Sequence, residues 1–178
     1  PQTRASERDE GGLYRFDGAR FVPAAVLALP AELRGQPVEQ VHEDAQGRVW
    51  VTCRDADRVV VLDGTNGATL ADLALDHGAA PGSLVLAEGA IDPIVCLEGE
   101  ERVVRLAFDG TIGDSADVGR MPRGLAITGD GACIFVTPFL AGGSPARVLE
   151  LDGATLAVAR DVELADAPGP DTAASARR

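Results

Sequence analysis

The sequence predicts an all-β protein built from repeated units. A short apolar run that ends in Asp-Gly occurs four times, as "LYRFDG" (13–18), "VVVLDG" (59–64), "RLAFDG" (105–110) and "VLELDG" (148–153). The chain of 178 residues also contains 21 Gly and 11 Pro but only 4% aromatic residues, and this composition favours many short elements joined by tight turns. The spacing of the four motifs gives a repeat unit of about 45 residues.

Each unit opens with a predicted hairpin. The three copies read "PVEQVHEDAQGRVWVTC" from Pro37, "PGSLVLAEGAIDPIVCL" from Pro81 and "PRGLAITGDGACIFVTP" from Pro122. Each has a short apolar run, a turn with Asp or Glu near Gly, and a second apolar run. Because Asp and Gly tolerate the positive φ angles of tight turns, the pattern predicts antiparallel hairpins at 37–53 and 121–137.

A third and a fourth strand follow each hairpin. The third ends in the Asp-Gly pair, and the fourth is an apolar run such as "TLADLAL" (69–75) or "TLAVARDVEL" (155–164). Four antiparallel strands in a recurring unit of this length are typical of a β-propeller blade. A parallel β-helix has shorter coils, a leucine-rich repeat would show a leucine ladder, and a β-sandwich does not require a returning period.

The repeats divide the chain into one half blade and three full blades. The half blade covers 12–29, and the full blades cover 37–75, 80–118 and 121–164. The ends, 1–11 and 165–178, are rich in Pro, Ala and charged residues and are expected to be linkers or disordered segments. Three and a half blades are too few to close a ring, so we expect an incomplete ring that is a fragment of a larger protein.

The composition of the chain argues against several partners and chemistries. The formal net charge of −12 disfavours nucleic acid and anionic lipid surfaces as partners. No apolar stretch reaches the roughly 20 residues of a membrane-spanning helix, so membrane insertion is not expected. All 16 basic residues are Arg, which removes lysine Schiff-base chemistry.

Four residues are candidates for a site at the central opening. Asp44, Glu88 and Asp130 occupy nearly matching hairpin turns, so their carboxylates could share one rim and bind calcium. Hairpin turns select acidic residues in any case, so we predict no cofactor and keep calcium as the alternative. We predict no catalytic residue and an ordinary structural position for His42. In the alternative His42 is the candidate base, since it could converge with Glu88 and Asp130 at the axis.

The three cysteines, Cys53, Cys96 and Cys133, show neither metal-binding nor redox-motif spacing. We expect buried or half-buried thiols that act as small hydrophobic side chains, with a disulfide or a reactive role as the alternative.

Two stretches resemble the YVTN-type repeats of bacterial propeller proteins. "MPRGLAITGDGACIFVTP" (121–138) resembles a whole opening hairpin of that family, and "GRVWVTC" (47–53) resembles its second strand. The copy "DPIVCLEGE" (92–100) lacks the Val-Thr pair. The resemblance implies a ring of about seven blades in the whole protein and a periplasmic or extracellular location.

Two function classes follow. The resemblance implies a non-catalytic binding or scaffold module whose partner is another protein or another domain of the same chain. The alternative is a lactonase-type hydrolase with a divalent metal at the central opening. Related sugar lactonases use Glu, Asn and Asp ligands, whereas Asn66, the only Asn of the chain, lies in a turn.

Overall fold

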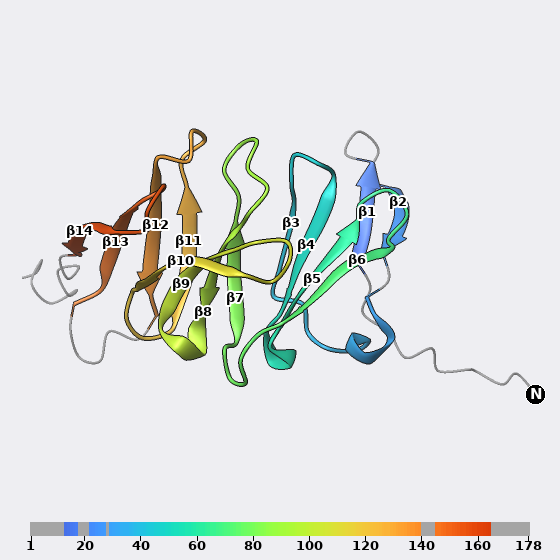
Figure 1. Cartoon of the computed structure of the whole chain (residues 1–178), viewed down its shortest axis with the longest axis horizontal. Coiled ribbons are helices and arrows are strands. Elements are labelled where there is room, and N and C mark those ends of the chain that lie inside the picture. Colours follow the sequence, from blue (N-terminus) through green and yellow to red (C-terminus); the bar gives the residue numbers. More distant parts are fainter. Residues whose placement is uncertain (1–12, 18–21, 28, 140–144, 165–178) are drawn as a thin grey trace, which may run out of the picture.

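The computed structural model describes residues 13–17, 22–27, 29–139 and 145–164, which form β-strands and short 3-10 helices (Figure 1). The first two strands, β1 (Leu13–Asp17) and β2 (Val22–Leu27), pair as an antiparallel two-stranded sheet. The expected terminal linkers, 1–11 and 165–178, lie outside the described residues.

Three four-stranded antiparallel sheets follow, each in simple strand order. Blade one contains β3 (Gln40–Glu43), β4 (Arg48–Cys53), β5 (Arg58–Asp63) and β6 (Thr69–Ala74). Blade two contains β7 (Pro81–Val85), β8 (Ile94–Leu97), β9 (Arg102–Leu106) and β10 (Ile112–Asp117). Blade three contains β11 (Pro122–Ile127), β12 (Cys133–Pro138), β13 (Arg147–Asp152) and β14 (Val158–Glu163). The predicted all-β fold of four-stranded propeller blades is confirmed.

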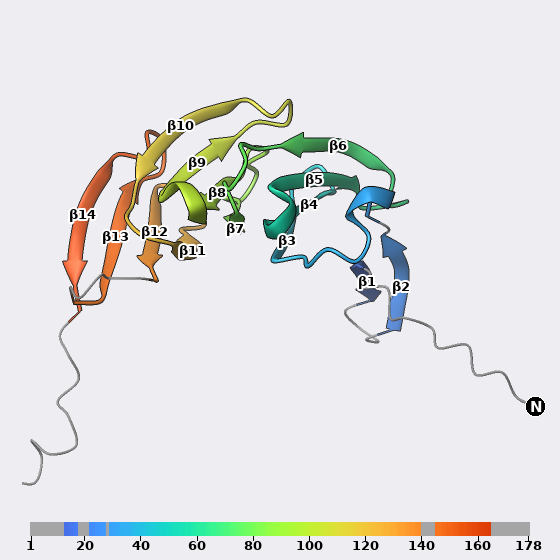
Figure 2. The ribbon, with the colours of Figure 1, turned by 90° about the horizontal axis from the view of Figure 1, so that it is seen from below.

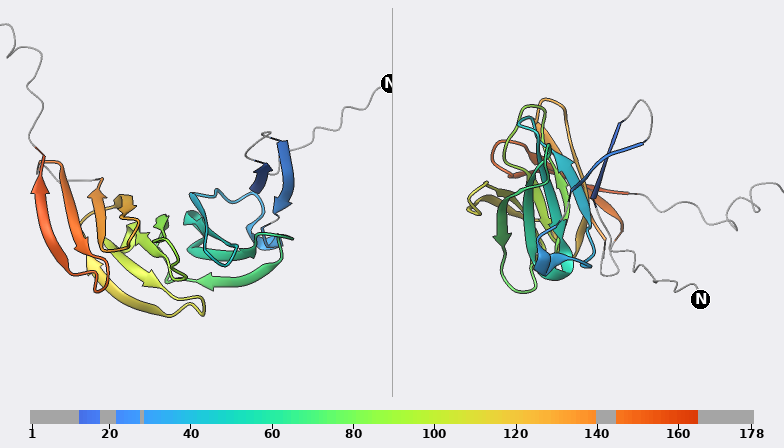
Figure 3. Two further views of the ribbon diagram at one scale, coloured as in Figure 1. Left: turned by 90° about the horizontal axis from the view of Figure 1, so that it is seen from above. Right: turned by 90° about the vertical axis from the view of Figure 1, so that its right-hand side faces the viewer.

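The blades stand side by side along an arc, as Figures 2 and 3 show. The first strands β3, β7 and β11 line the concave side, and the fourth strands β6, β10 and β14 lie on the convex side (Figure 2). The arc spans three full blades, so the ring is incomplete. No helix among the described residues is long and apolar enough to cross a membrane.

Apolar side chains fill the spaces between neighbouring blades, because each sheet must bury both faces. Between blades one and two, Trp50 and Val61 pack with Leu84 and Val95. Between blades two and three, Ile94 and Val103 belong to a second cluster. A third cluster covers the other face of blade one with residues of β2 and of the segment that follows it, Leu27, Leu29 and Leu33.

The Asp-Gly motifs join the third strand of each full blade to its fourth strand. Asp63, Asp109 and Asp152 each accept a hydrogen bond from the backbone N–H two residues further on, at 2.7, 2.9 and 3.1 Å. This is the Asx-turn geometry that makes Asp favourable at such a position. The sequence motif therefore marks one recurring turn.

The two ends of the blades carry different connections between strands, and we name each end by them. The turns β3–β4, β7–β8 and β11–β12 lie at one end, at the top of Figure 1, which we call the turn end. The 3-10 helices η2 (Arg54–Ala56) and η3 (Glu98–Glu100) follow the second strands at the opposite end, which we call the helix end. A further 3-10 helix, η1 (Ala31–Leu33), precedes blade one.

Candidate functional site: a charged cluster at the helix end

The acidic residues singled out from the sequence lie in the turns that join first and second strands. Asp44 follows β3, Glu88 lies between β7 and β8, and Asp130 lies between β11 and β12. The backbone N–H of Glu88 donates a hydrogen bond to the carbonyl of Gly129 at 3.3 Å, so the turns of blades two and three are adjacent. The Asp44 carboxylate instead contacts residues of its own blade.

The Asp44 carboxylate is buried and accepts four hydrogen bonds. Oδ1 accepts from the backbone N–H of Gln46 at 2.8 Å and of Arg48 at 3.0 Å. Oδ2 accepts from Arg48 Nε at 2.6 Å and from Trp50 Nε1 at 2.9 Å. Burial alone would raise the pKa of Asp44, but these donors outweigh it and hold that pKa below its ordinary value. Four donors match the four lone-pair directions of a carboxylate.

The Asp44 cluster connects blade one to blade two. The Arg48 guanidinium lies 4.8 Å from the centroid of the Phe108 ring in blade two, and Arg48 Nη2 donates to the carbonyl of Ile91 at 3.2 Å. The rings of Trp50 and Phe108 meet edge to face with centroids 6.3 Å apart. Asp44 thus fixes an arginine that is stacked across the interface between the blades.

The other two candidates are His42 of blade one and Asp130 of blade three. His42 is half-buried in β3, where its register partner is Trp50. Asp130 is exposed and accepts hydrogen bonds from Thr128 Oγ1 at 2.6 Å and from the backbone N–H of Ala132 at 3.0 Å. Within the described residues, no three His, Cys, Asp or Glu side chains form a group that could hold a metal ion.

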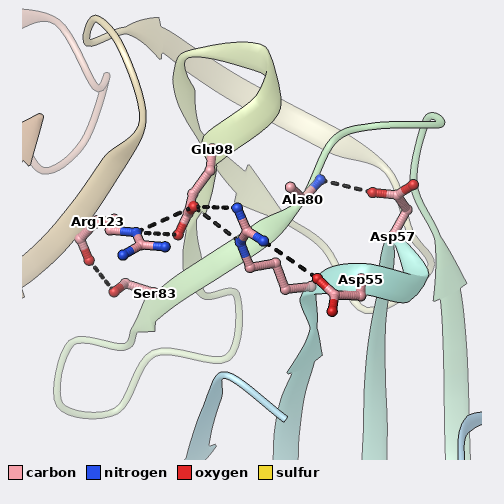
Figure 4. A network of polar contacts seen from close by, with 7 residues as sticks. Asp55, Asp57, Ala80, Ser83, Glu98 and Arg123 are labelled. Atoms are coloured by element: carbon pink, nitrogen blue, oxygen red, sulfur yellow. Dashed lines mark hydrogen bonds and ion pairs between the residues drawn. The ribbon is translucent and has the colours of Figure 1, made fainter. Parts of the chain in front are cut away.

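A different cluster brings charged side chains of all three blades together at the helix end (Figure 4). Glu98 of η3 is 3% exposed. Its Oε2 accepts from Arg54 Nε of blade one at 3.1 Å and lies 3.0 Å from Arg54 Nη2. Its Oε1 lies 3.4 Å from Arg123 Nε of blade three. One buried carboxylate therefore joins two arginines that belong to different blades.

Local sequence explains how Glu98 fits between its partners. Gly82 of β7 lies beside the Glu98 carboxylate, and a Cβ atom at Gly82 would approach Glu98 Oε1 to 2.6 Å. Ser83 Oγ donates a hydrogen bond to the backbone carbonyl of Arg123, which fixes β11 against β7 (Figure 4). The hydrogen bond from Arg54 to Glu98 also raises the pKa of Arg54, so this guanidinium remains charged.

A second contact at this end fixes the connection between blades one and two. Asp57 follows η2 in the left-handed region, with φ of 53°. Its carboxylate accepts hydrogen bonds from the backbone N–H groups of Gly78 and Ala80, both at 2.8 Å, and His77 Nδ1 lies 3.5 Å away. Burial raises the pKa of Asp57, but the two backbone donors and His77 outweigh it and lower that pKa overall.

Sequence reasoning missed the Glu98 cluster, although the repeat alignment contains a signal for it. Arg54 and Glu98 directly follow the second strand of adjacent blades, "VTCR" and "VCLE", so opposite charges occupy one repeat position. Adjacent blades place such positions side by side. The contribution of Arg123, from a first strand, has no comparable signal.

Comparison with known proteins supports the fold. No family model matches the chain, and no curated protein sequence is similar to it. Virginiamycin B lyase from Staphylococcus aureus has a similar structure, with a TM-score of 0.60 and 16% identity over 82% of this chain and 46% of its own. A putative 6-phosphogluconolactonase from Bacteroides fragilis gives a TM-score of 0.58 and 13% identity over 78% of this chain and 42% of its own.

Dihydro-heme d1 dehydrogenase NirN gives a TM-score of 0.62 and 10% identity over 86% of this chain and 33% of its own. These proteins share the four-stranded antiparallel sheets of β-propellers. The chain spans less than half the length of each of the three. At such low identities the similarity establishes the fold, and function has to be argued from the residues.

Proposed function

We propose that this chain is a non-catalytic binding or scaffold part of a larger β-propeller protein of the YVTN type. The observation that carries the proposal is the Glu98 cluster, in which a buried carboxylate holds Arg54 and Arg123 from two other blades. A cluster of this kind fixes the blades relative to one another. Rigid blades present their loops in a constant arrangement, as a binding scaffold requires.

The chain spans less than half the length of the three similar proteins, which supports the proposal that it is part of a larger protein. Its partner would be another protein or another domain of the same chain, and the net charge of −12 disfavours nucleic acid. The resemblance to YVTN repeats supports a periplasmic or extracellular location. No cofactor belongs to this proposal.

The competing function, a metal-dependent lactonase, has weaker support. A calcium ion on the turn end would need free carboxylate oxygens, yet both oxygens of Asp44 already accept hydrogen bonds from Gln46, Arg48 and Trp50. Binding a cation there would displace donors that hold blade one against blade two. We therefore rank the scaffold above the hydrolase.

The deciding experiment assays the purified chain with a panel of lactones, with and without added calcium or zinc. We expect no turnover above the uncatalysed rate in any condition. Metal-dependent turnover that disappears in His42→Ala would overturn the scaffold proposal and establish the hydrolase. A matched variant, His77→Ala, controls for the general loss of an imidazole, because the His77 side chain is fully exposed at the helix end.

A second measurement addresses the scaffold role directly. Glu98→Gln removes the charge that joins the three blades and keeps the size of the side chain. We expect this variant to exchange backbone amides of β7, β8 and β11 faster than the unmodified chain in hydrogen exchange. Unchanged exchange in all three strands would contradict the proposed role of the cluster in fixing the blades.

A further inference from the structure

The two faces of blade three have different surroundings. One face carries Ile134, Val136, Leu149 and Leu151, which are buried against blade two. Side chains alternate between the faces of a strand, so the intervening residues of β12, β13 and β14 share the opposite face. We call this the outward face, defined by Cys133, Phe135, Thr137, Val148, Glu150, Arg160 and Val162.

The outward face repeats the positions that are covered in the other two blades. Trp50, Ile94 and Phe135 occupy the same place in β4, β8 and β12, since each has register partners in the first and third strands of its own sheet. Trp50 is 0% exposed and Ile94 is 2% exposed because the next blade covers them, whereas Phe135 is 37% exposed.

The third strand gives the same result. Val59, Val103 and Val148 are equivalent, and each faces the side on which a following blade would lie. Val59 and Val103 are fully buried, whereas Val148 is only half-buried. Val162, which pairs with Val148, is 45% exposed. The apolar positions of an interface between blades are thus present on blade three.

We propose that the outward face is an interface between blades and that a further four-stranded blade of the same repeat covers it. The argument is continuity, because the outward face has the register of the two interfaces that the structure already contains. The opposite end of the arc differs, since Leu27, Leu29 and Leu33 cover the far face of blade one. The proposal rests on the proposed function, in which the chain is part of a larger β-propeller, and it does not depend on whether the chain is catalytic.

The polar residues of the outward face indicate how that blade would be recognised. Across the interface between blades two and three, Arg105 Nη2 donates to the carbonyl of Gly153, in the Asp-Gly turn of blade three, at 2.6 Å. Glu150 takes the place of Arg105 in blade three and pairs with Arg160 Nη2 at 2.8 Å. The Arg160 side chain is 70% exposed, so it is the cation available to the Asp-Gly turn of the covering blade.

The test uses Cys133 as a reporter on the outward face. Its thiol is half-buried, whereas Cys53 and Cys96 are fully buried, so N-ethylmaleimide should modify Cys133 first in the chain as it stands. Modification is followed by mass spectrometry, and Cys133→Ser should abolish the fast phase. Two extended variants carry an added blade after residue 164, a repeat of either 76–118 or 118–164, with Ser at each added cysteine.

We expect at least one added blade to slow modification of Cys133 tenfold or more. In that extended variant Phe135→Asp should restore fast modification, whereas Leu70→Asp, at an exposed position of β6, should not. If neither added blade slows the reaction, whether or not it folds, the proposal is wrong. If Cys133 of the unextended chain becomes protected as protein concentration rises, a second copy is the occupant and the proposal is also overturned.

Discussion

Replacing Asp44 by Ala should destabilise the chain more than any other change to an acidic residue at the turn end. The substitution leaves the Trp50 indole N–H without its acceptor in a site where Trp50 is 0% exposed. It also removes the carboxylate that holds the Arg48 guanidinium, whose side chain is 14% exposed.

The magnitude follows from these two losses. A buried donor without a partner costs about 1–3 kcal/mol, and a hydrogen bond to a charged group contributes about 1.5–3 kcal/mol. The two terms overlap because Arg48 and Trp50 share Asp44 Oδ2, so we expect a loss of about 3 kcal/mol in the free energy of unfolding. Asp44→Asn retains one acceptor oxygen, and we expect it to lose about half as much.

Denaturant unfolding at pH 7, followed by the fluorescence of Trp50, measures this loss. Asp130→Ala is the matched control, because Asp130 occupies the corresponding turn but is exposed, and it should change stability little. A loss below about 1 kcal/mol in Asp44→Ala would contradict this prediction, since the unpaired indole alone should exceed it. Stabilisation of the unmodified chain by calcium that vanishes in Asp44→Ala would refute it as well.

Three further outcomes are expected. The folded-state pKa of Asp44 is lowered, so the stability that its ionised carboxylate contributes is complete above about pH 4, the pKa of Asp in the unfolded chain. This stability is lost as pH falls through the folded-state pKa. In an acid titration Asp44→Asn should therefore lose stability less steeply than the unmodified chain. Glu98→Gln should lower the free energy of unfolding by about 1–2 kcal/mol, because both arginine partners are partly exposed and remain hydrated. In a double-mutant cycle with Arg54→Ala, the stability losses of the two substitutions should not add. A Cβ atom at Gly153 would overlap the carbonyl oxygen of Gly131, so Gly153→Ala should cost about 2 kcal/mol or more by thermal unfolding, whereas Gly129→Ala, with open space around its Cα, should not.

Much of the fold was predictable because it depends on local chemistry that recurs. The Asp-Gly pairs mark turns in which Asp63, Asp109 and Asp152 accept backbone N–H groups, and this requirement is visible in single residues. Strand count and strand order in each blade follow from the spacing of these turns.

The site was less predictable because it depends on contacts between blades. Asp44 and Asp130 occupy equivalent turns in the sequence, yet one is buried beneath Trp50 and Arg48 while the other is exposed. The difference arises from the residues that follow each turn and from Phe108 of the next blade, which the repeat pattern does not specify. Identical turn positions therefore acquired different roles.

The sequence alone predicts the all-β class, the repeat and the places of the turns, because periodicity and turn chemistry act over a few residues. Packing of the blades brings Glu98 to Arg54 and Arg123, and it leaves Phe135 exposed where Trp50 is covered. These contacts could not be predicted because they join residues that are far apart along the chain. Arg54 lies 44 residues from Glu98, and a carboxylate so far away becomes a partner only when packing of the blades brings it within hydrogen-bonding range.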